Sequence, residues 1–376
     1  MPLTLRQLNH LRIDWMKEQA LKVNLWLFDH PQSSAPTTSF QHSLSLKNVR
    51  RILCLRLDDK LGDMVVSTIL YREIKNAFPH IEIDVASGPA SLELLKNNPY
   101  VSNTLIFKKG TWNVLKLGAQ LLQRHYDLVI DVRPLIDART VYLLAQTKAP
   151  WILGVSRQKL NLMNLHLSEF EKNHHISEKY QKILNFLNIT PTHLQYDLFV
   201  TPQEIQKAKS LISEPAKIIV LNPFAGARYR SLNPEKIILI LNELLRQKGR
   251  QQIKIFLMCP PQEKGGLQSL IQQQNWKEVF VPQNFTNLRE YVALISLADL
   301  AISPDTAAVH IASAFNKPLI CFYRYDLDAP EINSQVWAPT SKKYKIIYAR
   351  KLNSEKSEID MSSFEPKDFE SALHWF

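Results

Sequence analysis

The sequence of 376 residues contains little cysteine and no long apolar run. Its three cysteines, Cys54, Cys259 and Cys321, stand far apart and lack the spacing of a metal site. They are typical of reduced core residues in a cytoplasmic protein. The longest apolar stretches have the length of strands, so no transmembrane helix is expected. Asp14 and Glu18 interrupt the N-terminal pattern where a secretory signal would be apolar.

The chain also lacks a clustered basic motif, although its net charge is +11. A charge of this size favours an acidic partner: nucleic acid, an anionic membrane surface or a phosphorylated substrate. The basic residues are scattered and no DNA- or RNA-binding motif is present, so nucleic acid is not an expected partner.

The apolar material is sufficient for two domains. Hydrophobic residues make up 45% of the chain and charged residues 22%, which is typical of a globular protein. We expect an N-terminal helix and linker over residues 1–48 and a first domain over 49–213. A second domain is expected over 214–345, and a C-terminal segment with a helix over 346–376.

The N-terminal 30 residues carry Leu5, Leu8, Leu11, Trp15, Leu21 and Leu25 at near-helical spacing, interrupted by basic residues. They predict one basic amphipathic helix. The favoured interpretation is a helix packed on the body of the protein. The alternative is contact in the plane of an anionic bilayer surface, which Trp15, Trp26 and the basic residues would suit. Residues 31–48 are rich in Ser, Thr and Pro and predict a linker.

Strand and helix patterns alternate from Arg51 onward. The expected strands of the first half are Arg51–Leu57, Ile81–Ala86, Asn103–Phe107, Tyr126–Asp131, Trp151–Val155 and Asp197–Val200. The expected helices between them are Met64–Phe78, Pro89–Asn97, Thr111–Arg124, Ile136–Gln146 and Tyr180–Leu187. Thr201 and Glu204 form a capping box with Pro202 between them, which predicts a further helix to Ile212. Residues 156–175 contain His166, His174 and His175 but no acidic or cysteine partner at ligand spacing, so a surface loop is favoured over a metal site.

The second half repeats the alternation. Its expected strands are Lys217–Asn222, Ile253–Met258, Val279–Val281, Leu300–Ser303 and Pro318–Phe322. Its expected helices are Pro234–Gln247, Glu263–Gln273, Asn287–Leu297, Thr306–Phe315 and Pro366–Trp375. Strands that alternate with helices predict parallel sheets with helical crossovers. The fold class is therefore α/β, with two Rossmann-like layers that face a central crevice.

Three loops follow strands on the side where such sheets bind ligands. The first, Leu57–Asp63, places Asp63 at the mouth of a helix, either for chemistry or as a helix cap. The second, Asn222–Asn233, combines small residues with Arg228 and Arg230, which suits an anion or is a polar connector. It fits neither the P-loop nor the dinucleotide fingerprint.

The third loop, Ser303–His310, places Asp305 and Thr306 at the start of a helix directly after a strand. Free backbone amides at such a helix start attract a diphosphate. Asp305 and Thr306 would equally serve as caps alone. His310 lies one turn later and is favoured as a packing residue over a base.

Three motifs in this order resemble glycosyltransferase family 9, whose best-known members are the ADP-heptose:lipopolysaccharide heptosyltransferases. They are R-L-D-D-K-L-G-D-M at Arg56–Met64, N-P-F-A-G-A-R at Asn222–Arg228, and D-T-A-A-V-H-I-A-S-A-F-N-K-P at Asp305–Pro318. The resemblance runs from about residue 51 to the end of the chain. It implies a GT-B fold whose last helix crosses back to the first domain. It also implies an inverting, metal-independent transfer of heptose from ADP-heptose to the inner core of lipopolysaccharide, without a cofactor.

Residue by residue, the resemblance places the catalytic base at Asp63 and the phosphate-binding lysine of the family near Arg230 or Ser231. The family's D-T-G donor motif falls on Asp305, Thr306 and Ala307. Arginine thus stands in for lysine, and alanine for the glycine after Thr306. The first 48 residues lie outside the family pattern.

The predicted site has a donor side and an acceptor side. The predicted donor-binding residues are Ala225, Gly226, Arg228, Arg230, Ser231, Met258, Glu263, Asp305, Thr306, Ala307 and His310. The predicted acceptor-binding residues are Asp58, Lys60, Gly62, Lys108, Arg133 and Arg139, with Lys109 as a further basic neighbour.

The expected partners are a nucleotide sugar and the anionic glycolipid Kdo-lipid A, at the cytoplasmic face of the inner membrane. Three alternatives stay open. They are a related transferase with another nucleotide sugar, a nucleotide-sugar epimerase on a similar fold, and a non-catalytic membrane-associated protein that binds a sugar nucleotide.

Overall fold

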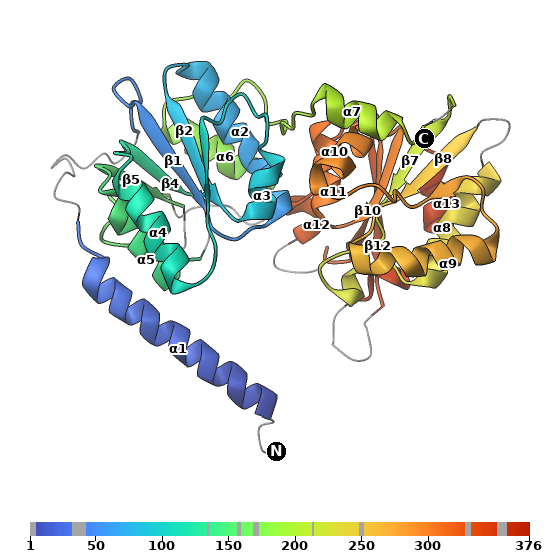
Figure 1. The fold of residues 1–376 in the computed structure, drawn as a ribbon, viewed down its shortest axis with the longest axis horizontal. Helices are drawn as coiled ribbons and strands as arrows, with labels where there is room; N and C mark the ends of the chain where they lie inside the picture. Colours follow the sequence, from blue (N-terminus) through green and yellow to red (C-terminus); the bar gives the residue numbers. More distant parts are fainter. Residues whose placement is uncertain are drawn as a thin grey trace.

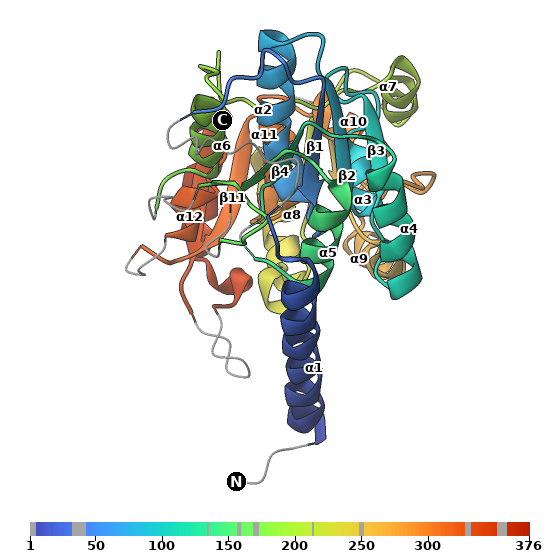
Figure 2. The same ribbon diagram turned by 90° about the vertical axis from the view of Figure 1, so that its left-hand side faces the viewer.

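The structure is a computed structural model that describes residues 5–31, 43–133, 135–155, 159–167, 173–212, 214–247, 252–327, 332–351 and 359–376. Two α/β lobes lie side by side, and a long N-terminal helix extends from the first (Figures 1 and 2). No helix among these residues has the length and apolarity needed to cross a membrane.

Each lobe is built on a six-stranded sheet, with the order β3-β2-β1-β4-β5-β6 in the first and β12-β11-β10-β7-β8-β9 in the second. Every strand pair is parallel. The first sheet contains β1 (Arg51–Arg56), β2 (Glu82–Ser87), β3 (Asn103–Ile106), β4 (Leu128–Asp131), β5 (Trp151–Gly154) and β6 (Leu165–His166). The second contains β7 (Lys217–Leu221), β8 (Ile253–Leu257), β9 (Val279–Phe280), β10 (Leu300–Pro304), β11 (Leu319–Arg324) and β12 (Tyr344–Ala349). The two predicted α/β layers are therefore confirmed.

The helices cover both faces of the sheets. Those before the second sheet are α1 (Leu5–Phe28), α2 (Leu61–Ala77), α3 (Pro89–Leu94), α4 (Thr111–Leu122), α5 (Ala138–Thr147), α6 (Ile176–Phe186) and α7 (Pro202–Lys209). The helices that follow β7 in the chain are α8 (Pro234–Gln247), α9 (Lys264–Gln274), α10 (Leu288–Leu297), α11 (Ala307–Ala314), α12 (Asn333–Val336) and α13 (Pro366–Leu373). Short 3₁₀ turns lie at Arg228–Arg230, Pro261–Glu263 and Met361–Ser363.

The first strand and helix place the opening loop at the carboxyl edge of the first sheet. β1 is almost wholly buried, and α2 packs an unbroken buried run from Met64 to Ile74 against the core. The helix begins at Leu61, three residues before the predicted start at Met64. Gly62 and Asp63 therefore belong to the first helical turn, and the loop is shorter than predicted.

Helix α7 belongs to the second lobe, so the predicted boundary at residue 213 is wrong. The predicted capping box is confirmed, with Thr201 accepting from the Glu204 amide and Glu204 from the Thr201 amide. The Glu204 carboxylate also binds the buried Arg289 of α10 with two hydrogen bonds of 2.8 and 2.9 Å. Because α7 packs on α10, the chain enters the second lobe before Thr201.

The segment before α7 is an unpaired connection, where a strand at Asp197–Val200 was predicted. Arg72 of α2 holds it: its side chain donates to the backbone oxygens of His193 and Gln195 at 2.7 Å each and pairs with Asp197. These side-chain bonds satisfy the backbone without a sheet neighbour. The predicted loop 156–175 lies partly outside the described residues, and its described part contains the short strand β6.

The closing helix packs on the second lobe, so the prediction that it crosses back to the first is wrong. Phe369 and Ala372 of α13 are buried in the core of the second lobe, against α8 and β12. The strand β12 was not predicted, and it spans the expected boundary between residues 345 and 346. The side chains of Lys343 and Lys345 lie over the Trp375 ring at 5.3 and 4.7 Å.

Among the side chains that the structure describes, those that anchor helix α1 lie toward its C-terminal end. Leu21, Leu25 and Phe28 pack on the first lobe, and the Phe28 ring contacts Tyr142 of α5 edge-on at 5.4 Å. Asp29 then accepts a hydrogen bond of 3.0 Å from the Leu162 amide. The packed-helix interpretation is thus confirmed for this end, whereas the rest of α1 extends past the lobe (Figure 2).

We predict that Arg72→Ala destabilises the first lobe, because it leaves buried Glu73 and half-buried Asp197 without their cation. Removal of one partner of a buried ion pair costs about 3–5 kcal/mol. Chemical denaturation followed by circular dichroism measures the loss. The matched control is Arg246→Ala, whose pair with Glu243 is exposed on the arginine side. Equal stability of the two variants would contradict the assigned role of Arg72.

Candidate active site between the lobes

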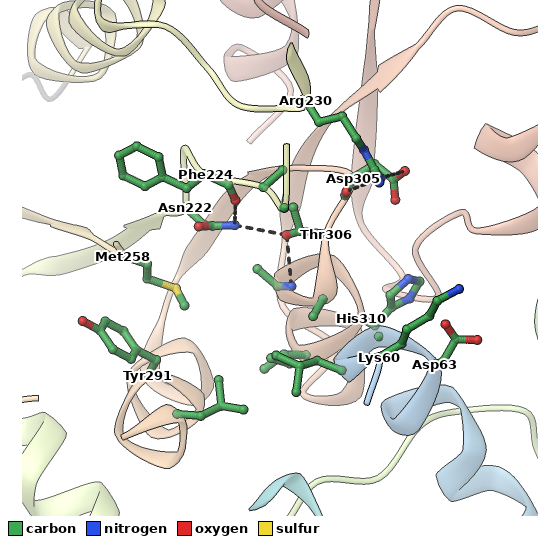
Figure 3. Close-up of a pocket in the computed structure, with 18 of the residues that line it drawn as sticks. Lys60, Asp63, Asn222, Phe224, Arg230, Met258, Tyr291, Asp305, Thr306 and His310 are labelled. Atoms are coloured by element: carbon green, nitrogen blue, oxygen red, sulfur yellow. Dashed lines mark hydrogen bonds and ion pairs between the residues drawn. The ribbon is translucent and has the colours of Figure 1, made fainter. Parts of the chain in front are cut away.

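A cavity of about 750 Å³ opens between the lobes. The first lobe contributes the residues from Lys60 to Asp63 at the start of α2. The second lobe contributes the loop after β7, the residues after β8 and the start of α11. Figure 3 shows Lys60 and Asp63 on one side of this space, with Met258 and Tyr291 on the other. The predicted crevice between two α/β layers is thus present.

Asp63 faces the cavity in the first turn of α2 and does not cap the helix. The N-cap residue is Lys60, and no side chain makes a capping hydrogen bond there. The Asp63 carboxylate, 21% exposed, instead pairs with the guanidinium of Arg56, which is 2% exposed. The capping alternative is therefore wrong, and Asp63 is a partly exposed carboxylate held from behind by a buried cation.

Arg56 is the first residue of the motif at Arg56–Met64, but no role was predicted for it. Its guanidinium also lies 3.4 Å from Asp58 and donates to the Tyr180 hydroxyl at 3.4 Å. Burial alone would lower the pKa of Arg56, but Tyr180, Asp63 and Asp58 together raise it above the usual value. Arg56 therefore keeps its charge inside the core. Its position at the end of β1, directly before the acidic loop, was the sequence feature that could have indicated a role beside Asp63.

The other residues of the opening loop have separate roles. Asp59, at a positive φ of 51°, accepts a hydrogen bond of 2.8 Å from the Ser91 amide and ties the loop to α3. Lys60 and Gly62 line the cavity, whereas Asp58 turns toward Arg56 instead. The predicted acceptor residues of this loop are therefore only partly brought to the cavity.

The start of α11 forms the opposite wall. The Thr306 hydroxyl accepts from the Ala308 amide at 3.2 Å and from the Asn222 side chain at 3.0 Å (Figure 3). Thr306 is thus a cap, as one of the two interpretations held, and it also lines the cavity beside Ala307. Because α11 points its N-terminus at the cavity, its backbone dipole favours an anion there.

Arg230 supplies the cation of this wall. Its guanidinium donates to the Asp305 carboxylate at 2.9 Å, and Asn333 donates to the same oxygen at 3.2 Å. Burial raises the pKa of Asp305 above its usual value, while Arg230 and Asn333 act in the opposite direction. The Nε atom of Arg230 is buried without a hydrogen-bond partner among the described residues. Arg230 is thus fixed in place with one donor unused.

Arg230 and Ser231 differ in where their side chains lie. The Ser231 hydroxyl accepts from the Ala225 amide at 2.9 Å and so braces its own loop. Arg228 is exposed in the same 3₁₀ turn and does not line the cavity, while Ala225 and Gly226 do. Of the two arginines, only Arg230 is placed to meet a ligand.

The far end of the cavity is apolar. Its side chains come from the β7 loop, the residues after β8 and α10: Phe224, Met258, Cys259, Pro260, Leu288 and Tyr291. Met258 was predicted. Leu288 and Tyr291 were missed because they lie in no motif, and Phe224 was missed although it lies inside the second motif. Glu263 is exposed in the turn before α9 and lies outside this wall.

His310 joins the two lobes instead of acting as a base. Burial lowers its pKa to about 3, so the imidazole is neutral at physiological pH. Its ring packs edge-on against the rings of Tyr196 and Trp337, with 5.9 and 5.7 Å between the ring centroids. A Cβ atom on Gly62 would lie 2.9 Å from His310 Cδ2, so α2 and α11 approach closely here. The packing interpretation is confirmed, although His310 also borders the cavity.

The remaining predicted acceptor residues do not line the cavity. Arg133 is buried and binds Asp131 and Thr140. Arg139 pairs with Asp137 and lies over the Phe107 ring at 5.7 Å, and Lys108 is exposed elsewhere on the first lobe. Within the described ranges, no group of three or more His, Cys, Asp or Glu side chains is arranged to hold a metal ion.

We predict that Gly62→Ala disturbs the contact between the lobes, because its methyl group would overlap the His310 ring. Overpacking of this kind costs about 1–3 kcal/mol. Thermal unfolding measures the loss. Gly226→Ala is the control, since its Cβ would meet nothing within 4 Å. A control as destabilised as Gly62→Ala would rule out steric packing as the cause.

The chain is similar to a known protein family and to individual members of it. The model of glycosyltransferase family 9 (heptosyltransferase) matches residues 114–367. The putative lipopolysaccharide heptosyltransferase 4 of Escherichia coli is 26% identical over 300 residues, which cover 78% of this chain and 80% of that protein.

Two solved structures from Escherichia coli share the fold. ADP-heptose lipopolysaccharide heptosyltransferase II has a TM-score of 0.68 and 18% identity, covering 86% of this chain and 97% of its own. Heptosyltransferase WaaC, solved with ADP-2-deoxy-2-fluoro heptose, has a TM-score of 0.63 and 16% identity, covering 86% of this chain and 99% of its own. The predicted GT-B fold is confirmed. Since the family model also matches more than half of the sequence, the chain belongs to glycosyltransferase family 9, the heptosyltransferase family, and is a glycosyltransferase.

Proposed function

We propose that this chain transfers heptose from ADP-heptose to the inner core of lipopolysaccharide, inverting the anomeric centre, with Asp63 as general base. One observation carries the proposal. A single cavity places the Asp63 carboxylate on one wall and an anion site, made by Arg230 and the N-terminus of α11, on the other. A sugar held by its diphosphate on the second wall would present its anomeric carbon toward the first.

The donor diphosphate would bind at the start of α11. The backbone amides there and the Arg230 guanidinium supply positive charge for the phosphate oxygens. Asp305 and Asn333 fix the guanidinium before the ligand arrives. Because these groups provide the charge that the leaving ADP needs, we propose no metal ion and no cofactor for the step.

The adenine would occupy the apolar end of the cavity. Met258, Tyr291 and Phe224 present polarizable or aromatic surfaces there, which suit the face of a purine ring. The WaaC structure with an ADP-heptose analogue supports an ADP sugar as the donor of a protein with this fold.

The transfer joins an acceptor hydroxyl to the anomeric carbon. The acceptor oxygen attacks from the side of Asp63 while the bond from carbon to the ADP oxygen breaks on the opposite side, so the configuration inverts. Asp63 takes the hydroxyl proton, and ADP leaves with its negative charge near Arg230 and α11. Arg56 orients the Asp63 carboxylate and does not contact the reacting atoms.

The names of the relatives and the charge of the chain support a proposal for the acceptor and its location. We propose a Kdo-bearing lipid A as the acceptor, met at the cytoplasmic face of the inner membrane. The net charge of +11 suits such an anionic glycolipid. Lys60, which lines the cavity beside Asp63, is the first-lobe cation placed to meet it.

Another nucleotide sugar is the second candidate donor, because Ala307 adds a methyl group to the wall where the family motif has glycine. A screen of ADP-, UDP- and GDP-sugars separates the two donors. Release of ADP that requires the lipid acceptor supports transfer. Consumption of donor without acceptor would point to an epimerase, and the absence of turnover to a binding protein.

We predict that Asp63→Asn lowers turnover by about 10²–10⁴-fold, since a positioned general base contributes on this scale. ADP binding, measured by calorimetry, should stay unchanged because the nucleotide lies on the other wall. Asp58→Asn is the matched control: it removes the other carboxylate beside Arg56, which does not line the cavity. Normal turnover of Asp63→Asn would remove Asp63 from the mechanism.

We predict that Arg230→Ala weakens ADP binding about 10- to 100-fold, as expected for loss of hydrogen bonds from a charged donor. Turnover should fall as well, because the leaving group loses its counter-charge. Arg228→Ala removes the exposed arginine two residues earlier and should change the dissociation constant little. If both variants bound ADP equally well, the diphosphate site would lie elsewhere.

A further inference from the structure

Exposed large apolar side chains gather on the first lobe. Of the described residues, only Phe280, Leu327 and Trp375 are exposed apolar side chains of this kind beyond residue 135. The others lie mainly on α1 and α4. An apolar concentration on one side of a protein indicates a contact surface, whereas scattered apolar residues carry no such meaning.

Helix α1 has two apolar faces, and only one is packed. Leu21, Leu25 and Phe28 lie against the lobe. Trp15, Met16, Val23, Trp26 and Leu27 are exposed on the other side of the helix, Trp15 by 61% and Trp26 by 77%. Helix α1 lies outside the part of the chain that the family model matches.

Helix α4 repeats the arrangement. Val114, Leu117 and Leu121 are buried against the lobe. The exposed side carries Trp112, Leu115, Ala119 and Leu122, which are spaced at three, four and three residues and so form one stripe. The Trp112 side chain is 84% exposed.

The two helices flank the same neighbour. A Cβ atom on Gly118 of α4 would lie 2.8 Å from the ring of Tyr142 on α5, and that ring meets Phe28 of α1. Both α1 and α4 pack on α5, and Figures 1 and 2 show the three helices on one side of the first sheet. The two exposed stripes therefore belong to one side of the first lobe.

This side is also basic. No Asp or Glu stands between Glu93 and Asp127, and Lys108, Lys109 and Lys116 within that interval are exposed. On α1 the cations Lys17 and Lys22 pair with Asp14 and Glu18, so α1 contributes apolar surface more than charge. The combination of exposed tryptophan and lysine matches the headgroup region of an anionic bilayer.

We propose that α1 and α4 form one docking surface for an anionic lipid bilayer, with the stripes in the interface and the three lysines at the headgroups. The proposal rests on the proposed function in one respect, namely that a lipid-linked acceptor requires the enzyme at a membrane. A twofold contact between two copies fits less well, because it would bring Lys108, Lys109 and Lys116 near their own copies.

Sedimentation with vesicles tests the docking surface on the full chain. The probes are vesicles of phosphatidylcholine alone and of phosphatidylcholine with phosphatidylglycerol. Trp15→Ser with Trp26→Ser, and separately Trp112→Ser, should lower partitioning onto the anionic vesicles by about tenfold or more. Lys108→Gln with Lys109→Gln and Lys116→Gln should lower binding to the level seen with neutral vesicles. Trp375→Ser, an exposed tryptophan of the second lobe, is the control and should bind as the native chain does.

Two outcomes would overturn the docking surface. One is unchanged vesicle binding by the tryptophan variants. The other is a native dimer in light scattering that the variants convert to monomer while vesicle binding is absent, which would make the face a contact between copies. Activity on a short, soluble acceptor separates the two proposals. Variants that lose vesicle binding should keep this activity, and its absence from the native chain would refute the transferase proposal alone.

Discussion

The close approach of α2 and α11 is the constraint on which the site depends. Gly62 leaves space for the buried His310 ring, so the first turn of α2 packs directly against this side chain of α11. Both helices begin at carboxyl ends of parallel strands, where such folds place their ligands. The same contact that joins the lobes therefore brings Asp63 opposite the anion-binding start of α11.

Two arginine–aspartate pairs, one in each lobe, face the cavity with opposite charges. Arg56 lies deep in the first lobe, and Asp63 is the more exposed partner that faces the cavity. In the second lobe the order is reversed, because Asp305 is the more buried partner and Arg230 is the one that faces the cavity. One pair thus presents a carboxylate and the other a guanidinium. A base and a phosphate-binding cation on opposite walls are what a transfer from a nucleotide diphosphate sugar needs.

The sequence predicts the two sheets and the three cavity loops because alternating apolar strands and amphipathic helices are local patterns. It places Asp63, Arg230, Asp305 and Thr306 correctly at the cavity. It misses what depends on tertiary partners. Arg72 holds the 193–197 connection without a sheet, α7 joins the second lobe through Arg289, and α13 packs on the nearer core. Arg133 and Arg139 are neutralised by acids two residues away, a pairing that no motif reveals.

The two lobes differ in the number of large apolar side chains that they expose. In the proposed function the second lobe binds a small nucleotide sugar, and its described residues include few large exposed apolar side chains. The first lobe carries the stripes of α1 and α4, on the lobe that supplies Asp63. The most direct test of the central account is an NMR measurement of transfer from ADP-heptose of known anomeric configuration to a Kdo-bearing acceptor. The account predicts one ADP released for each glycosidic bond formed, with the anomeric configuration inverted; a product with retained configuration would contradict direct attack assisted by Asp63.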